Sequence, residues 1–190
     1  MDPVYVSETV RHGVLRNYDF SEAEVPISAL RTALRRLGDE ILHVQPRVME
    51  ELVAAVLRDY FPNCMARICG RTGDHGIDLI VVESERSIAV QVKRRSQTDA
   101  VERVMQVREF LGASLVEGFD HLMYVSTADH FSSGQAGAQQ FANDAVARRV
   151  VESFELVDRH RFLGMLGLIP KELEDPWRAF VPPILLIDRR

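Results

Sequence analysis

Two short apolar runs separated by a polar segment stand out in the middle of the chain. Residues 79–82 are all Leu, Ile or Val, and residues 88–92 return to this pattern after the polar segment 83–87. Runs rich in β-branched residues are typical of strands, and a short polar link between two of them favours a β-hairpin. Three polar side chains accompany these runs where a buried strand does not need them, namely Asp78, Gln91 and Lys93.

The alternation of side chains along a strand predicts that these polar groups share one face of the hairpin. Gln91 and Lys93 are two residues apart, so they point the same way. If the turn is centred between residues 85 and 86, Asp78 lies opposite Lys93. A slip of one residue would send Asp78 to the other face. The pattern therefore predicts an acid, an amide and an amine at one end of a hydrophobic hairpin.

The rest of the pattern alternates between helical and strand periods. Apolar positions recur at helical spacing over residues 26–43, 46–61, 98–116 and 132–147, and residues 63–70, 121–126 and 150–157 are typical of strands. Asp158 is expected to cap a short helix over residues 159–166. In order these elements predict an α/β fold with a mixed central sheet flanked by helices.

Length and composition indicate an ordinary globular protein. The chain has 190 residues, of which 46% are hydrophobic and 27% charged, which suits one domain with a substantial core. We expect an N-terminal arm and helix over residues 1–44, a central domain over 45–168 and a C-terminal extension over 169–190. No apolar run reaches a membrane-spanning length and no secretory signal is visible, so a cytoplasmic location is expected.

Charge is unevenly distributed along this acidic chain. The formal net charge is −5, which argues against a surface covered with phosphate-binding groups. The segment 86–108 is nevertheless basic and contains Arg86, Lys93, Arg94, Arg95, Arg103 and Arg108. A basic rim beside the polar hairpin suits an enzyme that holds nucleic acid locally, and a solvated helix face explains the same charges equally well.

Two interpretations of the polar hairpin remain open from the residues alone. Asp78 and Lys93 can form a cross-strand ion pair, which contributes only about 0.2–1 kcal/mol and leaves Gln91 unexplained. Alternatively, the Asp78 carboxylate, the Gln91 amide oxygen and the Val92 carbonyl bind a hard cation such as Mg²⁺ or Mn²⁺. Lys93 would then orient the attacking water and stabilise charge on a phosphate.

The stretch around Asp78, Gln91 and Lys93 resembles the Mrr-type restriction endonuclease branch of the PD-(D/E)xK nuclease superfamily. The resemblance covers roughly residues 45–166 and includes a glycine-rich turn, a G-I-D-L-I-like strand and a Q-V-K strand. It implies a restriction-endonuclease-like αβββαβ core and a metal-dependent DNA endonuclease of the restriction or phage-defence type. It also implies that Glu50, on the preceding helix, binds a second metal or orients the water. His75 departs from the family pattern, which more often has a second glycine there.

DNA is the partner that this resemblance implies. Candidate DNA contacts are Arg71, His75, Arg94 and Arg95. A homodimer or a partner protein of a defence system would supply the second cut or the specificity. The alternatives are a catalytically silent DNA-binding or assembly module with the same fold, and a structure-specific nuclease that acts on junctions.

Overall fold

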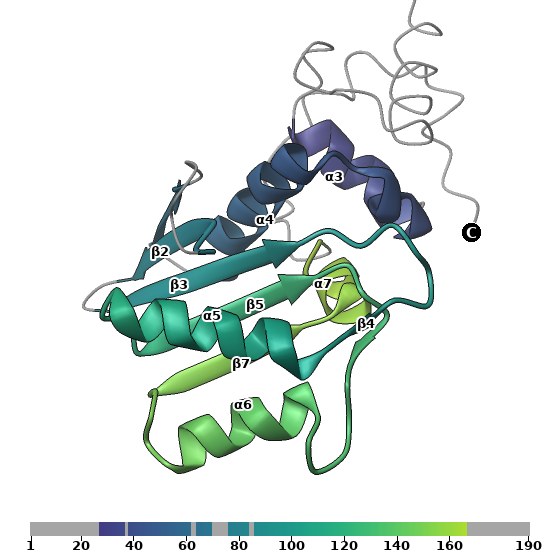
Figure 1. Ribbon diagram of the computed structural model, residues 1–190. Coiled ribbons are helices and arrows are strands. Elements are labelled where there is room, and N and C mark those ends of the chain that lie inside the picture. Colours follow the sequence, from purple (N-terminus) through teal and green to yellow (C-terminus); the bar gives the residue numbers. More distant parts are fainter. Residues whose placement is uncertain (1–26, 37, 62–63, 70–75, 84–85, 167–190) are drawn as a thin grey trace, which may run out of the picture.

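A five-stranded mixed sheet forms the centre of the protein (Figure 1). The computed structural model describes residues 27–36, 38–61, 64–69, 76–83 and 86–166. The strands lie in the order β1-β2-β3-β5-β7, with β1, β2 and β3 antiparallel and β3, β5 and β7 parallel. Their bounds are Cys64–Ile68 (β1), Leu79–Glu83 (β2), Arg86–Lys93 (β3), His121–Ser126 (β5) and Ser153–Val157 (β7). The predicted α/β class with a mixed sheet is confirmed.

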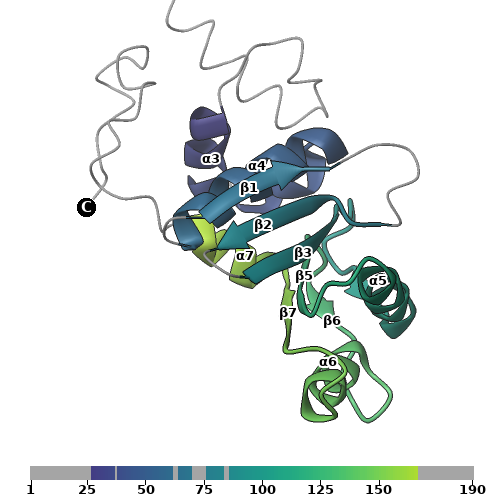
Figure 2. The same ribbon diagram turned by 90° about the vertical axis from the view of Figure 1, so that its left-hand side faces the viewer.

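Helices cover both faces of this sheet (Figure 2). One face carries α4 (Pro46–Tyr60) and α7 (Arg159–Met165), with α3 (Ile27–Arg36) and the 3₁₀ helix η1 (Gly38–His43) packed beyond α4. The other face carries α5 (Val104–Val116) and α6 (Ala138–Ala147). A short parallel pair, β4 (Val101–Glu102) and β6 (His130–Phe131), lies beside the main sheet. The protein is therefore an α/β sandwich.

The alternation along β3 divides the interior into two hydrophobic cores. Val90 points toward the α4 side, where it packs with Met49 and Leu52. Ala89 points the opposite way and packs with Phe110 and Tyr124 on the α5 side. All six side chains are essentially inaccessible to solvent. Because strand residues alternate between faces, the side chains of Gln91 and Lys93 lie on the same face of the sheet as Ala89, which is the face that α5 covers.

The hairpin register differs from the predicted one by two positions. Glu83 pairs with Arg86 and Leu79 with Val90, so paired residue numbers sum to 169 instead of the expected 171. The expectation that Asp78 lies opposite Lys93 is therefore wrong. Asp78 precedes the paired residues of β2, and its backbone N–H donates to the Val90 carbonyl at 3.0 Å. A two-residue shift leaves each strand residue on its expected face, so Gln91 and Lys93 still share one side.

The helix expected over residues 98–116 begins later than predicted. It starts at Val104, because Val101 and Glu102 form the short strand β4. Met105, in the first turn of this helix, is 61% exposed. The same error affects the next helix, which begins at Ala138 rather than near residue 132. The predicted cap of α7 is confirmed, since the Asp158 carboxylate accepts the Arg161 N–H at 2.8 Å.

Neither terminal segment belongs to the part of the chain that the structure describes. The predicted arm over residues 1–25 and the C-terminal extension over residues 169–190 lie outside the described residues, so the proposed domain limits stay predictions. Among the helices of the described ranges, none combines the length and the apolar character needed to span a bilayer.

Candidate functional site

The carboxylate of Asp78 is fixed against the end of β3. The Val92 backbone N–H donates to Asp78 Oδ2 at 2.7 Å. The Asp78 main chain is held as well, because its carbonyl accepts the Cys69 N–H at 2.8 Å. The paired part of β2 begins only at Leu79, so the carboxylate supplies an acceptor for Val92 beyond the end of the ladder. Asp78 therefore has a defined orientation before any ligand binds.

Gln91 lies against the backbone of Gly76. Gly76 has a φ of +83°, and a Cβ atom added to it would lie 3.1 Å from Gln91 Nε2. Any other residue at this position would need a left-handed backbone conformation, and its Cβ would also crowd the Gln91 amide. Two features therefore favour glycine at position 76, namely its positive φ and the close approach of the Gln91 amide.

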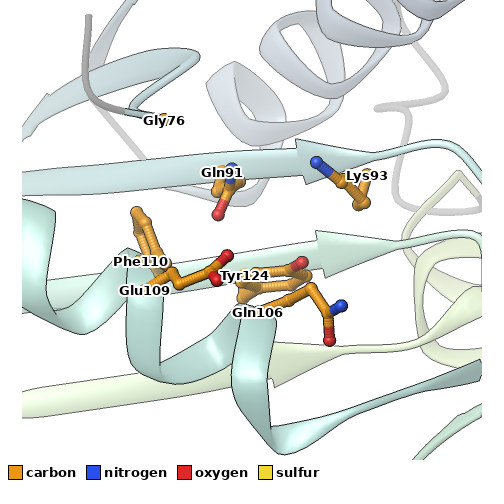
Figure 3. A pocket seen from close by; sticks show the side chains of 7 residues that line it. All are labelled: Gly76, Gln91, Lys93, Gln106, Glu109, Phe110 and Tyr124. Carbon is orange, nitrogen blue, oxygen red and sulfur yellow. The ribbon is translucent and has the colours of Figure 1, made fainter.

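Gln91 and Lys93 line a small open cleft between β3 and α5, with a volume of about 140 Å³. Figure 3 shows Gln91 pointing from β3 toward α5, with Glu109 across from it, and Lys93 reaching back along the strand toward Gln91. The full lining consists of Gly76, Gln91, Lys93, Gln106, Glu109, Phe110 and Tyr124. The cleft therefore joins the predicted site residues of β3 to polar side chains of α5.

The α5 side of the cleft was the part that sequence reasoning largely missed. Gln106 and Glu109 of α5 line the cleft, and no motif in the sequence singles them out. Gln106 Oε1 is buried, and no hydrogen-bond partner for it occurs among the described residues. Glu109 is exposed at the rim. Their spacing of three residues on one helix places them on neighbouring positions of one face, which is the signal that points to them once α5 is known to cover β3.

Tyr124 forms part of the floor of the cleft and is fully buried. Its hydroxyl donates to Glu102 Oε1 at 3.2 Å. Burial, with the negative charge of Glu102 and this hydrogen bond, raises the pKa of Tyr124 far above its ordinary value of 10.0. The phenol therefore stays protonated and acts as a hydrogen-bond donor rather than as a base.

The two arginines that follow Lys93 have partners within the protein. Arg95 forms a two-pronged ion pair with Glu102, with Nε at 2.9 Å from Oε2 and Nη2 at 2.5 Å from Oε1. The hydrogen bond to Glu102 raises the pKa of Arg95 further. Arg94 Nη1 donates to the Leu42 carbonyl at 3.0 Å. Their expected contacts with DNA stay predictions, and the structure gives each guanidinium an intramolecular partner in addition.

Three further predicted site residues are Glu50, Arg71 and His75. Glu50 is half-buried in α4, the helix that covers the face of the sheet opposite Gln91 and Lys93. Its predicted role at the metal site is not tested by this arrangement. Arg71 and His75, both expected to contact DNA, lie outside the described residues.

The donor chemistry at the end of β3 fits a hard divalent cation. The Asp78 carboxylate, the Gln91 amide and the Val92 carbonyl all offer oxygen, which is the ligand that Mg²⁺ and Mn²⁺ prefer. Within the described ranges no three His, Cys, Asp or Glu side chains come together in a group that could hold a metal. A cation at this position would therefore rely on amide and main-chain oxygens beside the single fixed carboxylate.

Comparison of the sequence with known proteins gives a family match over most of the described chain. Residues 41–166 match Mrr_cat, a model described as restriction endonuclease. This stretch contains the whole five-stranded sheet, the helices α4, α5, α6 and α7 that cover its two faces, and the cleft. Neither a curated protein nor a solved structure matched the chain.

Proposed function

The chain belongs to the Mrr-type restriction endonuclease family, and on this premise we propose that it is a divalent-metal-dependent DNA endonuclease of the restriction or phage-defence type. A nuclease domain implies DNA as the substrate. The observation that carries the proposal is the fixed Asp78 carboxylate, held by the Val92 N–H at 2.7 Å, at the strand end that also bears Gln91 and Lys93.

Asp78, Gln91 and Val92 are the proposed ligands of Mg²⁺ or Mn²⁺, through the carboxylate, the amide oxygen and the backbone carbonyl. When bound, such a cation supplies Lewis-acid stabilisation of the charge that develops on the phosphate oxygens. The chain orients these donors in advance. The Val92 N–H fixes the Asp78 carboxylate, and the Gly76 backbone confines the Gln91 amide.

Lys93 is the proposed group that orients the attacking water and stabilises the negative charge of the phosphate. Its amine extends along β3 beside Gln91 (Figure 3), and it lines the same cleft. An ammonium group in a partly water-excluded site interacts with a developing oxyanion more strongly than it would in bulk water. The role therefore requires a cation at this position, and a neutral side chain of similar length would abolish it.

Glu50 is proposed to orient the water or to bind a second cation. The family resemblance supports this role, and Glu50 is half-buried in α4. Because α4 covers the face of the sheet opposite Gln91 and Lys93, Glu50 would act from the other side of the strand end. Arg71, His75, Arg94 and Arg95 are proposed to contact the DNA backbone, where the positive charge of the arginines would favour phosphate.

The proposed function is tested by incubating covalently closed plasmid DNA with the protein in Mg²⁺ or Mn²⁺. We expect nicked or linear products with the wild type, none in chelator, and none with Asp78→Asn. Asp120→Asn is the matched control, because Asp120 has an exposed side chain and precedes β5 at the opposite end of the strand from Ser126. DNA binding without any cleavage would reject the nuclease proposal in favour of a binding module. Cleavage of branched but not linear DNA would redefine the substrate.

A further inference from the structure

Glu102 is a buried carboxylate whose two oxygens are both occupied by neighbouring side chains. It is 0% exposed. Oε1 accepts from Arg95 Nη2 at 2.5 Å and from the Tyr124 hydroxyl at 3.2 Å. Oε2 accepts from Arg95 Nε at 2.9 Å and lies 2.9 Å from the Ser126 hydroxyl. A buried charge is tolerated when it is paired and hydrogen-bonded in this way.

The two strand residues that bond Glu102 are the direct neighbours of the two cleft residues of β3. In the parallel pairing of β3 with β5, Gln91 lies beside Tyr124 and Lys93 lies beside Ser126. Both Tyr124 and Ser126 therefore connect one carboxylate to the part of β3 that carries the proposed site. The Ser126 hydroxyl also lies 3.3 Å from the Lys93 carbonyl oxygen.

The chain just after Lys93 is held by the same group of residues. The Thr127 N–H donates to the Lys93 carbonyl at 3.0 Å. The Arg95 N–H donates to Thr127 Oγ1 at 2.6 Å, and that hydroxyl lies 2.9 Å from the Arg95 carbonyl oxygen. Arg95 is thus held through its main chain by Thr127 and through its guanidinium by Glu102. These contacts restrict the short segment from Lys93 to Arg95.

A contribution to stability alone does not account for this arrangement. Ion pairs buried in a protein often stabilise the fold no better than apolar side chains of similar volume, because desolvation offsets the attraction. Their better-attested effect is to fix one arrangement of the chain. A bidentate Arg–carboxylate pair is geometrically restrictive, and here it bridges the end of β3 to β4.

We propose that Glu102 and Arg95 act as a positioning pair, which holds Gln91 and Lys93 in place for DNA cleavage through Tyr124, Ser126 and Thr127. This inference rests on the proposed function, since it assumes that Gln91 and Lys93 belong to the cleavage site. Arg95 then acts mainly through Glu102, and its contact with DNA is secondary.

The test uses Glu102→Gln, Arg95→Met and the double variant in the full chain. Misplacement of a reacting group by about 1 Å costs on the order of a hundredfold in rate, so we expect each single variant to slow single-turnover cleavage by about 10- to 100-fold. The double variant should be no slower than the worse single variant, because both substitutions remove one interaction. DNA affinity in chelator should stay unchanged or rise in Glu102→Gln, since Arg95 then keeps an unpaired charge.

The matched control is a second Arg–Glu pair that does not touch the cleft. Arg161 Nη2 lies 2.5 Å from Glu155 Oε2, and both side chains are partly exposed. Glu155→Gln and Arg161→Met should leave the cleavage rate within about twofold of the wild type, as expected for an exposed pair. Wild-type rates in Glu102→Gln and Arg95→Met, or an equal slowing in the control variants, would overturn the proposal.

Amide hydrogen exchange supplies a readout that does not depend on cleavage. Positioning predicts faster exchange in a peptide covering residues 91–96 in Glu102→Gln, with the α4 and α7 peptides unchanged. Unaltered exchange in residues 91–96 would overturn the proposal even if cleavage were slower. If the wild type cuts no DNA, the proposed function fails, and the exchange experiment still decides whether Glu102 holds this segment.

Tyr124→Phe tests the same idea with a smaller change. It keeps the buried ring and removes one of the hydrogen bonds to Glu102. We expect slower cleavage than in the wild type but faster than in Glu102→Gln, with the melting temperature close to that of the wild type. A Tyr124→Phe protein that cuts as fast as the wild type, together with a Glu102→Gln protein that does not fold, would assign the network to folding and reject the positioning role.

Discussion

The Val92 N–H donates a 2.7 Å hydrogen bond to Asp78 Oδ2. The Asp78 side chain, just before β2, thus accepts a backbone N–H of β3 beyond the last residue pair of β2 and β3. Hydrogen bonds to an ionised acceptor are short and directional, and this one fixes the carboxylate where the proposed cation would bind. Through this contact Asp78 is fixed at the same end of the hairpin as Lys93, although the two residues are not paired across the strands.

Asp78→Asn should separate metal binding from folding. An asparagine side-chain oxygen can still accept the Val92 N–H, so the melting temperature should change little. Loss of the carboxylate charge should weaken Mn²⁺ binding at least about tenfold, measured by calorimetry with a DNA duplex whose phosphodiesters resist hydrolysis. Asp120→Asn serves as the control and should bind Mn²⁺ as the wild type does. Equal Mn²⁺ affinity in Asp78→Asn and wild type would remove Asp78 from the proposed ligand set.

Gln91→Glu should tighten metal binding to the free protein. A neutral amide in place of a second carboxylate leaves the proposed site with a single charged ligand, and we expect Mg²⁺ to bind weakly without DNA. A glutamate adds one negative charge, which should raise Mn²⁺ affinity by about tenfold or more. Gln139→Glu, on the exposed surface of α6, controls for the change in net charge. Tight Mg²⁺ binding by the wild type without DNA would contradict this account.

Gly76→Ala should impair cleavage more than it impairs stability. Gly76 and Gly118 both have positive φ, of +83° and +80°, but only a Cβ at Gly76 would approach Gln91, at 3.1 Å from Nε2. Each alanine should cost about 1–2 kcal/mol of backbone strain. Chemical denaturation should therefore show similar losses in both variants, whereas cleavage should fall only in Gly76→Ala. Similar cleavage rates in both variants would mean that the position of Gln91 is unimportant.

The faces of the hairpin were predictable from sequence, but its register was not. Strand alternation alone places Gln91 and Lys93 on one side, and a shift by two residues does not alter this. The register depends on where the turn closes, and the polar segment between the strands contains no glycine, proline or asparagine to mark that point. The pairing of Glu83 with Arg86 was therefore not specified by a recognisable turn motif.

The network around Glu102 was invisible for a different reason. Val101 and Glu102 fit the helical pattern of the residues that follow, so the local period favoured an earlier start of α5. In the structure they pair with β6, and the Glu102 carboxylate binds Arg95, Tyr124 and Ser126, all of which come from other segments. Buried polar contacts between distant segments leave no periodic signal in a single sequence. The cap of α7 at Asp158 was predictable because its hydrogen bond spans only three residues.

Tyr124 should set part of the alkaline stability of the protein. Its pKa is raised in the folded state, by burial first and by the charge of Glu102 second, from an ordinary value of 10.0. The protonated phenol is thus favoured by folding, and this stability is fully present below about pH 10 and lost as the pH rises further.

In an absorbance titration of the native protein, Tyr124 should ionise only together with unfolding. Tyr124→Phe should abolish this alkali-linked step and Tyr60→Phe should retain it. Ionisation of Tyr124 near pH 10 in the native protein would contradict its buried position.

The central claim is that the β3 end bearing Lys93 is a phosphodiester-cleaving site, and Lys93→Met tests it most directly. The measurement is single-turnover cleavage of plasmid DNA in Mg²⁺ by the wild type and Lys93→Met, with DNA affinity in chelator determined on the same preparations. The account predicts that the wild type cuts, and that Lys93→Met binds DNA within about threefold of the wild-type affinity, because one phosphate contact contributes modestly, yet does not cut. Cleavage by Lys93→Met at the wild-type rate would place the reaction elsewhere in the protein.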